Sequence, residues 1–169
     1  MLNAHVETYR LLKSIPGTDK VKIGLVKNIF QFDPLRRWHL LDWAFSKILN
    51  DVYTNAPLEF LKTGKSSFYM PGMVDNEMLN PEAPGTLDFI GLNYYSRMHV
   101  KGRLNPEEPF VFDTRQQDIM TDMGYPLYAE GFYRALKTIS EMEVPIYVTE
   151  NGLADDKDTV RPLFIERYL

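Results

Sequence analysis

Apolar and polar positions follow two periods along the chain, and the change of period predicts where helices and strands alternate. Helical spacing occurs in four stretches, residues 3–14, 35–62, 127–142 and 160–169. Strand-like runs occur in three stretches, residues 21–28, 87–95 and 144–150, and the last of them is rich in β-branched residues. We expect Asn55-Ala-Pro57 to interrupt the second helical stretch, because proline disrupts a helix interior. Helices that alternate with strands predict βαβ units and a parallel sheet in one domain, residues 1–169.

One face of each predicted strand has small or apolar side chains first and polar side chains last. These faces are Gly24, Val26 and Asn28; Gly91, Asn93 and Tyr95; and Ile146, Val148 and Glu150. Because side chains alternate along a strand, Tyr147 and Thr149 are expected on the opposite face. The carboxyl ends of parallel strands meet at one edge, so the polar residues should cluster there. Asn151-Gly152 is also an ordinary turn signal, so this segment alone leaves a purely structural role for Glu150 open.

Three motifs in this order resemble those of the glycoside hydrolase family 1 β-glycosidases. The first is Asn93-Tyr94-Tyr95 at a strand end, and the last is Thr149-Glu150-Asn151-Gly152. Between them, Thr121–Gly131 resembles a Gly-Trp-x-x-Tyr-Pro-x-Gly-like stretch before a helix, with Tyr125 where Trp is usual and Ala129 where Pro is usual. The resemblance covers nearly the whole chain, from the segment 3–10 to the segment 161–165.

This resemblance implies an α/β fold that forms part of a (β/α)₈ TIM barrel. The three strands would be about the fifth to the seventh, with their helices. A complete barrel typically needs about 250 residues and eight strands. Both ends of the 169-residue chain fall inside predicted helices, so we expect the middle-to-late portion of a longer enzyme. Such a portion has two open strand edges, through which we expect pairing with another copy or with the missing segments.

The resemblance also assigns candidate site residues. Retaining glycosidases use two carboxyl groups about 5–5.5 Å apart, of which one attacks the sugar and the other donates a proton. By its motif, Glu150 resembles the nucleophile, and Tyr95 resembles the tyrosine that hydrogen-bonds to it. Asn93 matches a residue that lines the same site, and Asn28 is a further substrate-binding candidate from the first strand. Without the motif, Tyr95 would be interpreted as a core tyrosine with a hydrated hydroxyl.

The second carboxylate has no counterpart in the sequence. In the family it lies in an Asn-Glu-Pro motif, which does not occur here. Glu143 precedes the same strand as Glu150, so seven residues of extended chain separate the two by roughly 20 Å. Asp33 follows the first strand, but Asp-Pro is mostly a turn pair. We therefore expect a chain that has the nucleophile but no acid/base, and that is inactive in isolation.

Composition excludes several other classes of protein. A net charge of −4, from 19 basic and 23 acidic residues, provides no basic surface for nucleic acid. The absence of cysteine excludes disulfides and thiolate metal sites, and the three histidines are isolated, so we expect no metal and no cofactor. There is neither a signal-peptide core nor an apolar run long enough for a membrane span, so a soluble, cytoplasmic protein is the default.

Two functions remain open at this point. The first is a β-glycosidase that hydrolyses β-glucosides, their 6-phosphates or related β-glycosides with retention, with the β-glycoside as its substrate. The second is a non-catalytic remnant that binds sugar or assembles with another chain. The two differ in whether another part of the protein supplies the missing carboxylate.

Overall fold

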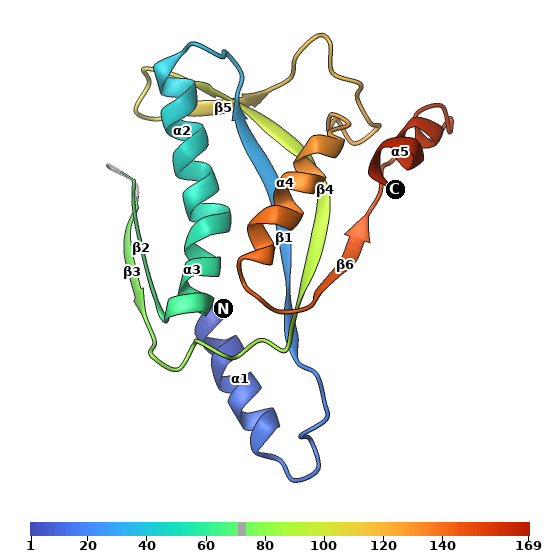
Figure 1. Ribbon diagram of the computed structural model, residues 1–169. Helices are drawn as coiled ribbons and strands as arrows, with labels where there is room; N and C mark the ends of the chain where they lie inside the picture. Colours follow the sequence, from blue (N-terminus) through green and yellow to red (C-terminus); the bar gives the residue numbers. More distant parts are fainter. Residues whose placement is uncertain (71–73) are drawn as a thin grey trace.

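Three parallel strands form the centre of the structure, β1 (Gly24–Pro34), β4 (Phe89–Gly102) and β6 (Ile146–Asn151). The computed structural model describes residues 1–70 and 74–169 (Figure 1). Strand β4 pairs with β1 on one side and with β6 on the other, and its far end pairs antiparallel with the short β5 (Phe110–Asp113). The parallel sheet expected from the sequence is therefore present, with β4 in the middle.

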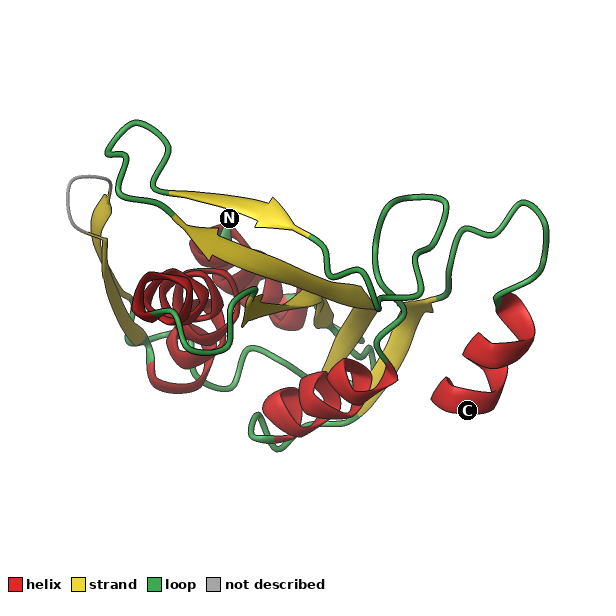
Figure 2. Ribbon diagram, turned by 90° about the horizontal axis from the view of Figure 1, so that it is seen from above, coloured by secondary structure: helices red, strands yellow, loops and turns green. Residues whose placement is uncertain are grey.

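The described residues form six helical segments. They are α1 (Leu2–Ser14), α2 (Leu40–Asn50), the π-helix η1 (Asp51–Asn55), α3 (Ala56–Thr63), α4 (Ala129–Ser140) and α5 (Arg161–Tyr168). Of these, α2 and α4 lie directly along one side of this sheet. Figure 2 shows from above how the helices gather on one side of the strands. This one-sided cover is what each βαβ unit of a barrel provides, because the helices form the outer layer.

The main core lies between the sheet and these helices. Alternate residues of β4, namely Ile90, Leu92 and Tyr94, are completely buried and pack with Ala135 and Ile139 of α4. At about 25 cal/mol per Å² of buried apolar surface, each such side chain stabilises the fold by about 1.5–3 kcal/mol. Alternation along β4 thus separates a dry outer face, which contacts helices, from an inner face that bears Gly91, Asn93 and Tyr95.

The expected break at Asn55-Ala-Pro57 is wrong. Helix α2 continues through η1 into α3 without an interruption, and Pro57 lies in the first turn of α3. The single π-helical turn η1 directly precedes Pro57, and its shifted hydrogen-bond pattern lets the helical run continue past a residue that has no backbone N–H. The helical run also begins at Leu40 rather than at residue 35.

Other boundaries differ from the sequence-based expectation as well. Strands β1 and β4 extend to Pro34 and Gly102, well past the predicted ends at residues 28 and 95. A hairpin of β2 (Lys65–Met70) and β3 (Val74–Leu79) flanks α3 and was not predicted. Both additions depend on partner strands, which a single-strand pattern cannot reveal.

Helix α1 is attached at the opposite end of the sheet from β5. Its Val6 is fully buried against Phe60 and Leu61 of α3. Asp88, just before β4, pairs with Lys13 of α1 at 2.7 Å and accepts a hydrogen bond from the backbone N–H of Ile23 at 2.8 Å. Within residues 1–70 and 74–169, no helix is long and apolar enough to cross a membrane.

Candidate active site

Three polar residues lie in one row across the parallel strands. Asn28 of β1 pairs in register with Asn93 of β4, and Asn93 pairs in register with Glu150 of β6. Neighbouring residues in register on parallel strands share a face of the sheet, so the three side chains lie on the inner face. We call Asn28, Asn93 and Glu150 the site row. The sequence predicted that these residues converge, and the strand register confirms it.

The expected face of the rest of β6 is wrong. Ile146 and Val148 pair with Ile90 and Leu92, which face the helices, so they lie on the outer side rather than beside Glu150. Tyr147 pairs with Gly91 and therefore lies on the inner side, where the sequence placed Ile146 and Val148. Strict alternation, applied to the whole strand, assigned each of these three residues to the wrong face.

A β-bulge explains why Glu150 nevertheless faces inward. The register shifts after the Leu92–Val148 pair, so that Thr149 has no partner and Glu150 is the next paired residue. One extra residue in a strand breaks the alternation, and two consecutive side chains can then face the same side. Thr149 accordingly lies on the inner face with Glu150, whereas the sequence had placed it on the opposite face.

Tyr95 donates a hydrogen bond from its hydroxyl to Oε2 of Glu150, which confirms the contact expected from the motifs. The Glu150 carboxylate that accepts this hydrogen bond raises the pKa of the Tyr95 hydroxyl above its ordinary value, and partial burial adds to the effect. Tyr95 therefore remains a protonated donor at neutral pH. This hydrogen bond holds the Glu150 carboxylate on the inner face of the sheet.

Thr149 makes a second polar contact on the inner face, which sequence reasoning missed. Its hydroxyl donates to Oδ1 of Asn93 at 2.6 Å. Thr149 belongs to the Thr-Glu-Asn-Gly motif, but strict alternation predicts it on the opposite face from Glu150. Only the bulge brings it to Asn93, and nothing in the strand pattern marks that bulge.

A cavity of about 590 Å³ opens beside the site row. It is lined by Asn28, Phe30, Tyr95, Thr121, Met123, Tyr125, Gly152, Leu153 and Ala154. The segment around Tyr125 reaches it because the backbone N–H of Asp122 donates to the carbonyl of Ala154, just after the motif Thr149–Gly152. The middle motif and the last motif, which are far apart in sequence, thus form one wall. A mainly apolar lining with a few polar groups, such as Asn28 and Thr121, is typical of a small-molecule site.

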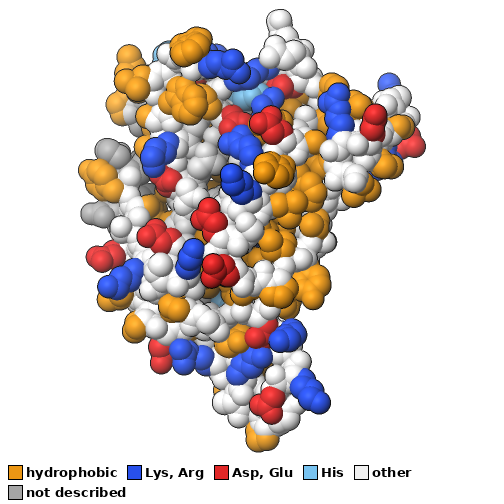
Figure 3. Space-filling view, in the orientation of Figure 1, with side chains coloured by type: hydrophobic (Ala, Val, Ile, Leu, Met, Phe, Trp, Pro, Cys, Tyr) orange, Lys and Arg blue, Asp and Glu red, His pale blue; other side chains and the backbone are white. Residues whose placement is uncertain are grey.

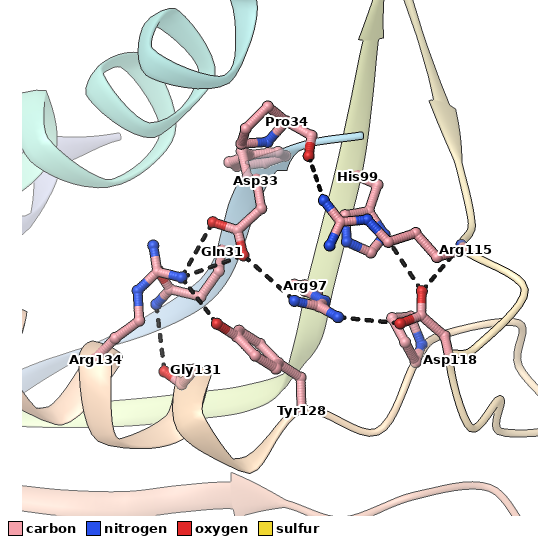
Figure 4. Close-up of polar contacts among 12 residues, drawn as sticks. Gln31, Asp33, Pro34, Arg97, His99, Arg115, Asp118, Tyr128, Gly131 and Arg134 are labelled. Carbon is pink, nitrogen blue, oxygen red and sulfur yellow. Dashed lines mark hydrogen bonds and ion pairs between the residues drawn. The ribbon is translucent and has the colours of Figure 1, made fainter. Parts of the chain in front are cut away.

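The other two carboxylates considered from the sequence, Asp33 and Glu143, lie apart from the site row. Asp33 accepts two hydrogen bonds from Nη1 of Arg134, at 3.0 and 3.1 Å, and lies 3.8 Å from Arg97 (Figure 4). Glu143 lies before β6, at the other end of the strand from Glu150. The described part of the chain therefore contains one candidate carboxylate in the site row, Glu150.

Asp33 belongs instead to a set of paired charges, Asp33, Arg97, Asp118 and Arg134, which we call the charge network (Figure 4). Arg97 of β4 pairs with Asp118 at 3.0 Å, and this fixes the long connection between β5 and α4 against the sheet. That connection continues into the cavity wall around Tyr125. No group of three or more histidine, aspartate or glutamate side chains suited to a metal ion occurs within the described residues.

Comparisons with known proteins identify one family along nearly the whole chain. The model of glycosyl hydrolase family 1 matches residues 1–166. β-Glucosidase A of Thermotoga maritima is 30% identical over 173 residues, which cover 92% of this chain and 36% of that protein. The β-galactosidase of Pyrococcus woesei is 27% identical over 194 residues, which cover all of this chain and 38% of the relative.

Solved structures agree with these sequence matches. The β-glycosidase from Pyrococcus horikoshii superposes with a TM-score of 0.78 at 30% identity, over 99% of this chain and 37% of that one. A family 1 β-glucosidase from Thermotoga maritima gives a TM-score of 0.78 at 25% identity, over 99% of this chain and 41% of its own. The chain thus spans less than half the length of these relatives. With its parallel strands, its outer helices and a family match from end to end, the chain belongs to glycosyl hydrolase family 1 and forms part of that family's TIM barrel.

Proposed function

We propose that this chain forms the nucleophile-bearing part of a retaining β-glycosidase that acts on β-glucosides or related β-glycosides. The observation that carries the proposal is the hydrogen bond from Tyr95 to Glu150, made at the end of β6 within the site row. Glu150 is the nucleophile, Tyr95 holds it by a hydrogen bond, and Asn93 and Asn28 contact the sugar. The named relatives are β-glucosidases and β-galactosidases, which is consistent with a β-glycoside substrate.

In this mechanism Glu150 attacks the anomeric carbon and forms a glycosyl ester while the bond to the leaving group breaks. The hydrogen bond from Tyr95 orients the attacking oxygen toward the inner face, where the cavity lies. A second carboxyl group must protonate the leaving oxygen and later activate water. Because the sequence has no Asn-Glu-Pro, that group would come from strands that this chain does not contain.

Covalent trapping tests the role of Glu150. A 2-deoxy-2-fluoro-β-glucoside with a dinitrophenolate leaving group needs no protonation, and it should leave a glycosyl label on the nucleophile. The reagent would be applied to the chain completed by the remaining barrel strands of a family member, followed by peptide mapping by mass spectrometry. We expect the label on Glu150 and none in the Glu150→Gln variant. A label on another carboxylate would refute the proposed role.

A second candidate function is a non-catalytic part that binds sugar or assembles with another chain. It is favoured by the exposure of side chains that a complete barrel would cover, with 51% of Val26 and 58% of Tyr147 accessible. Strands β1 and β6 also each have one edge without a partner strand within the described residues. Figure 3 shows further hydrophobic side chains gathered near the start of α2, where Trp38 and Leu40 are exposed.

Two measurements on the purified 169-residue chain test what both functions expect of the chain alone, whereas the covalent trapping separates the two functions. The chain alone should show no appreciable hydrolysis of an aryl β-glucoside, because general acid catalysis contributes about 10²–10⁴-fold and most sugar contacts are missing. Its open strand edges should favour association, which light scattering would detect as a mass above that of one chain. Robust turnover by a monomer that is lost in Glu150→Gln would contradict this expectation.

A further inference from the structure

Thr149 occupies a position that a regular strand would not give it. Because of the bulge, it lies on the inner face next to Glu150, and its hydroxyl is 2.6 Å from Oδ1 of Asn93. The hydroxyl is the donor in this contact, since the amide oxygen can only accept. The bulged residue thus connects the strand that bears Glu150 to the amide at the centre of the site row.

Gly91 makes room for this arrangement. A Cβ at Gly91 would lie 3.0 Å from Oγ1 and 3.1 Å from Cγ2 of Thr149, and 2.9 Å from a methyl group of Val26. A side chain at position 91 would therefore be crowded, and Val26 and Thr149 would have to shift by a few tenths of an ångström to accommodate it. A glycine in a strand interior weakens the strand, and here it allows the close approach of a neighbouring side chain.

The contact decides which side of the Asn93 amide remains free. With Oδ1 engaged by Thr149, the two N–H groups of Nδ2 have no hydrogen-bond acceptor among the described residues. Asn93 pairs in register with Glu150, so these donors lie on the same face as the carboxylate and the cavity. If the amide were free to rotate, it could present either its oxygen or its nitrogen to a ligand.

We propose that Thr149 is a positioning residue that holds the Asn93 amide with its N–H groups free to donate to a hydroxyl group of a sugar bound beside Glu150. The identity of the ligand, a sugar, rests on the proposed function, whereas the Thr149–Asn93 contact is the 2.6 Å hydrogen bond described above. Thr149 acts through Asn93 and does not touch the sugar. Preorganised donors of this kind improve recognition because the ligand does not have to order them.

The first test uses nuclear magnetic resonance of the ¹⁵N-labelled 169-residue chain. The side-chain NH₂ signals of Asn93 are identified by their loss in Asn93→Asp. Thr149→Val keeps the branched shape and removes the hydroxyl, so it should shift these signals, whereas Thr149→Ser should leave them near the wild-type position. Backbone signals of β4 report whether each variant is folded, and Thr149→Ala replaces Thr149→Val if that variant is not. Unchanged Asn93 NH₂ signals in a folded variant that lacks the hydroxyl would overturn the inference.

The second test adds a sugar-like probe, the iminosugar 1-deoxynojirimycin, to the same variants in the chain completed by the remaining barrel strands, because the chain alone lacks most sugar contacts. We expect the Asn93 NH₂ signals to move on titration, and Thr149→Val to weaken binding about three- to tenfold, as expected for one hydrogen bond. Thr149→Ser should bind like the wild type. Equal affinity of the wild type and Thr149→Val would overturn the role of Thr149. If the wild type binds no probe, the proposed sugar site is contradicted, and the Asn93 signals of the first test still decide whether Thr149 positions the amide.

Discussion

The site row and the charge network both lie toward the carboxyl ends of the strands, but they differ in how their polar side chains are paired and exposed. In the charge network each charge faces an opposite one, and the side chains of Arg97 and Asp118 are only 16% and 4% exposed. In the site row, Glu150 is exposed and accepts one side-chain hydrogen bond, from Tyr95. The paired charges keep the connection around the cavity in place, whereas the open carboxylate remains accessible to a ligand.

This contrast has an energetic basis. Placing two opposite charges in a buried site adds little net stability, but removing one partner leaves the other uncompensated, at a cost of about 3–5 kcal/mol. An exposed carboxylate such as Glu150 is solvated whether or not the chain is folded, so changing it costs little stability. Mutation of Glu150 in the site row should therefore lower turnover and leave stability nearly unchanged, whereas mutation in the charge network should lower stability.

The largest expected effect is on turnover at Glu150. In the chain completed by the remaining barrel strands, Glu150→Gln should lower kcat by about 10⁴-fold or more, because it removes the attacking group. The free energy of unfolding should change by less than about 0.5 kcal/mol, since the side chain is exposed. Steady-state kinetics and urea unfolding measure the two quantities. A large stability loss with normal turnover would reverse the assignment of the two clusters.

The charge network should show the reverse behaviour. Asp118→Asn should lower the free energy of unfolding by about 3 kcal/mol, because it leaves the buried Arg97 with only the longer 3.8 Å contact to Asp33. Asp113→Asn is the matched control, since Asp113 pairs with Lys101 at 3.4 Å but is 43% exposed. That pair should contribute less than about 1 kcal/mol. Equal losses in the two variants, measured by urea unfolding, would show that burial does not set the strength of the network.

Two adjacent tyrosines of β4 sharpen the comparison. Tyr95→Phe removes the donor to Glu150 and should lower kcat of the completed barrel about 10- to 100-fold, as expected for a hydrogen bond to a charged group. Tyr94 faces the opposite side, is fully buried, and donates to the carbonyl of Tyr128 at 2.8 Å. Tyr94→Phe should therefore lower stability by about 1 kcal/mol with little change in kcat. Similar kcat values for the two variants would contradict the role of Tyr95.

Sequence reasoning predicted the features that depend on one segment at a time. The three parallel strands, the resemblance to family 1 and the contact between Tyr95 and Glu150 all follow from local motifs and from strand order. The roles of Asn93 and Asn28 in binding sugar stay predictions, although the structure places both residues in the site row.

The features that were missed depend on partners that lie far away in the sequence. The bulge at Thr149 is visible only once β6 is aligned with β4, and it reversed the expected faces of Ile146 and Val148. The charge network joins Asp33 to Arg134, which lies 101 positions later, so no spacing within one element indicates it. Asp33-Pro34, interpreted as a turn pair, in fact ends β1 and contributes a network charge.

The smallest expected effect concerns His99, which lies beside the charge network on β4. Its side chain is fully buried, and neither ring nitrogen has a hydrogen-bond partner among the described residues, although Nδ1 lies 3.4 Å from Oδ2 of Asp118. Burial lowers the pKa of His99 below its ordinary value of 6.5, and the nearby Arg97 and Arg115 lower it further, which outweighs the attraction of Asp118. His99 is therefore neutral in the folded chain at neutral pH.

The sign of the resulting pH dependence follows from this lowered pKa. Below about pH 6.5 His99 binds a proton in the unfolded chain but stays neutral in the folded chain. The free energy of unfolding should therefore decrease as the pH falls through this value. His99→Leu removes the titrating group without breaking a hydrogen bond, so urea unfolding at a series of pH values should show a flatter slope in this variant. Equal slopes for the wild type and His99→Leu would show that the folded network accommodates the charged imidazole. The site row contains no histidine, so the nuclear magnetic resonance signals of Tyr95 and Asn93 should not change as His99 titrates. A shift of those signals with the same pH midpoint would mean that the two clusters are coupled.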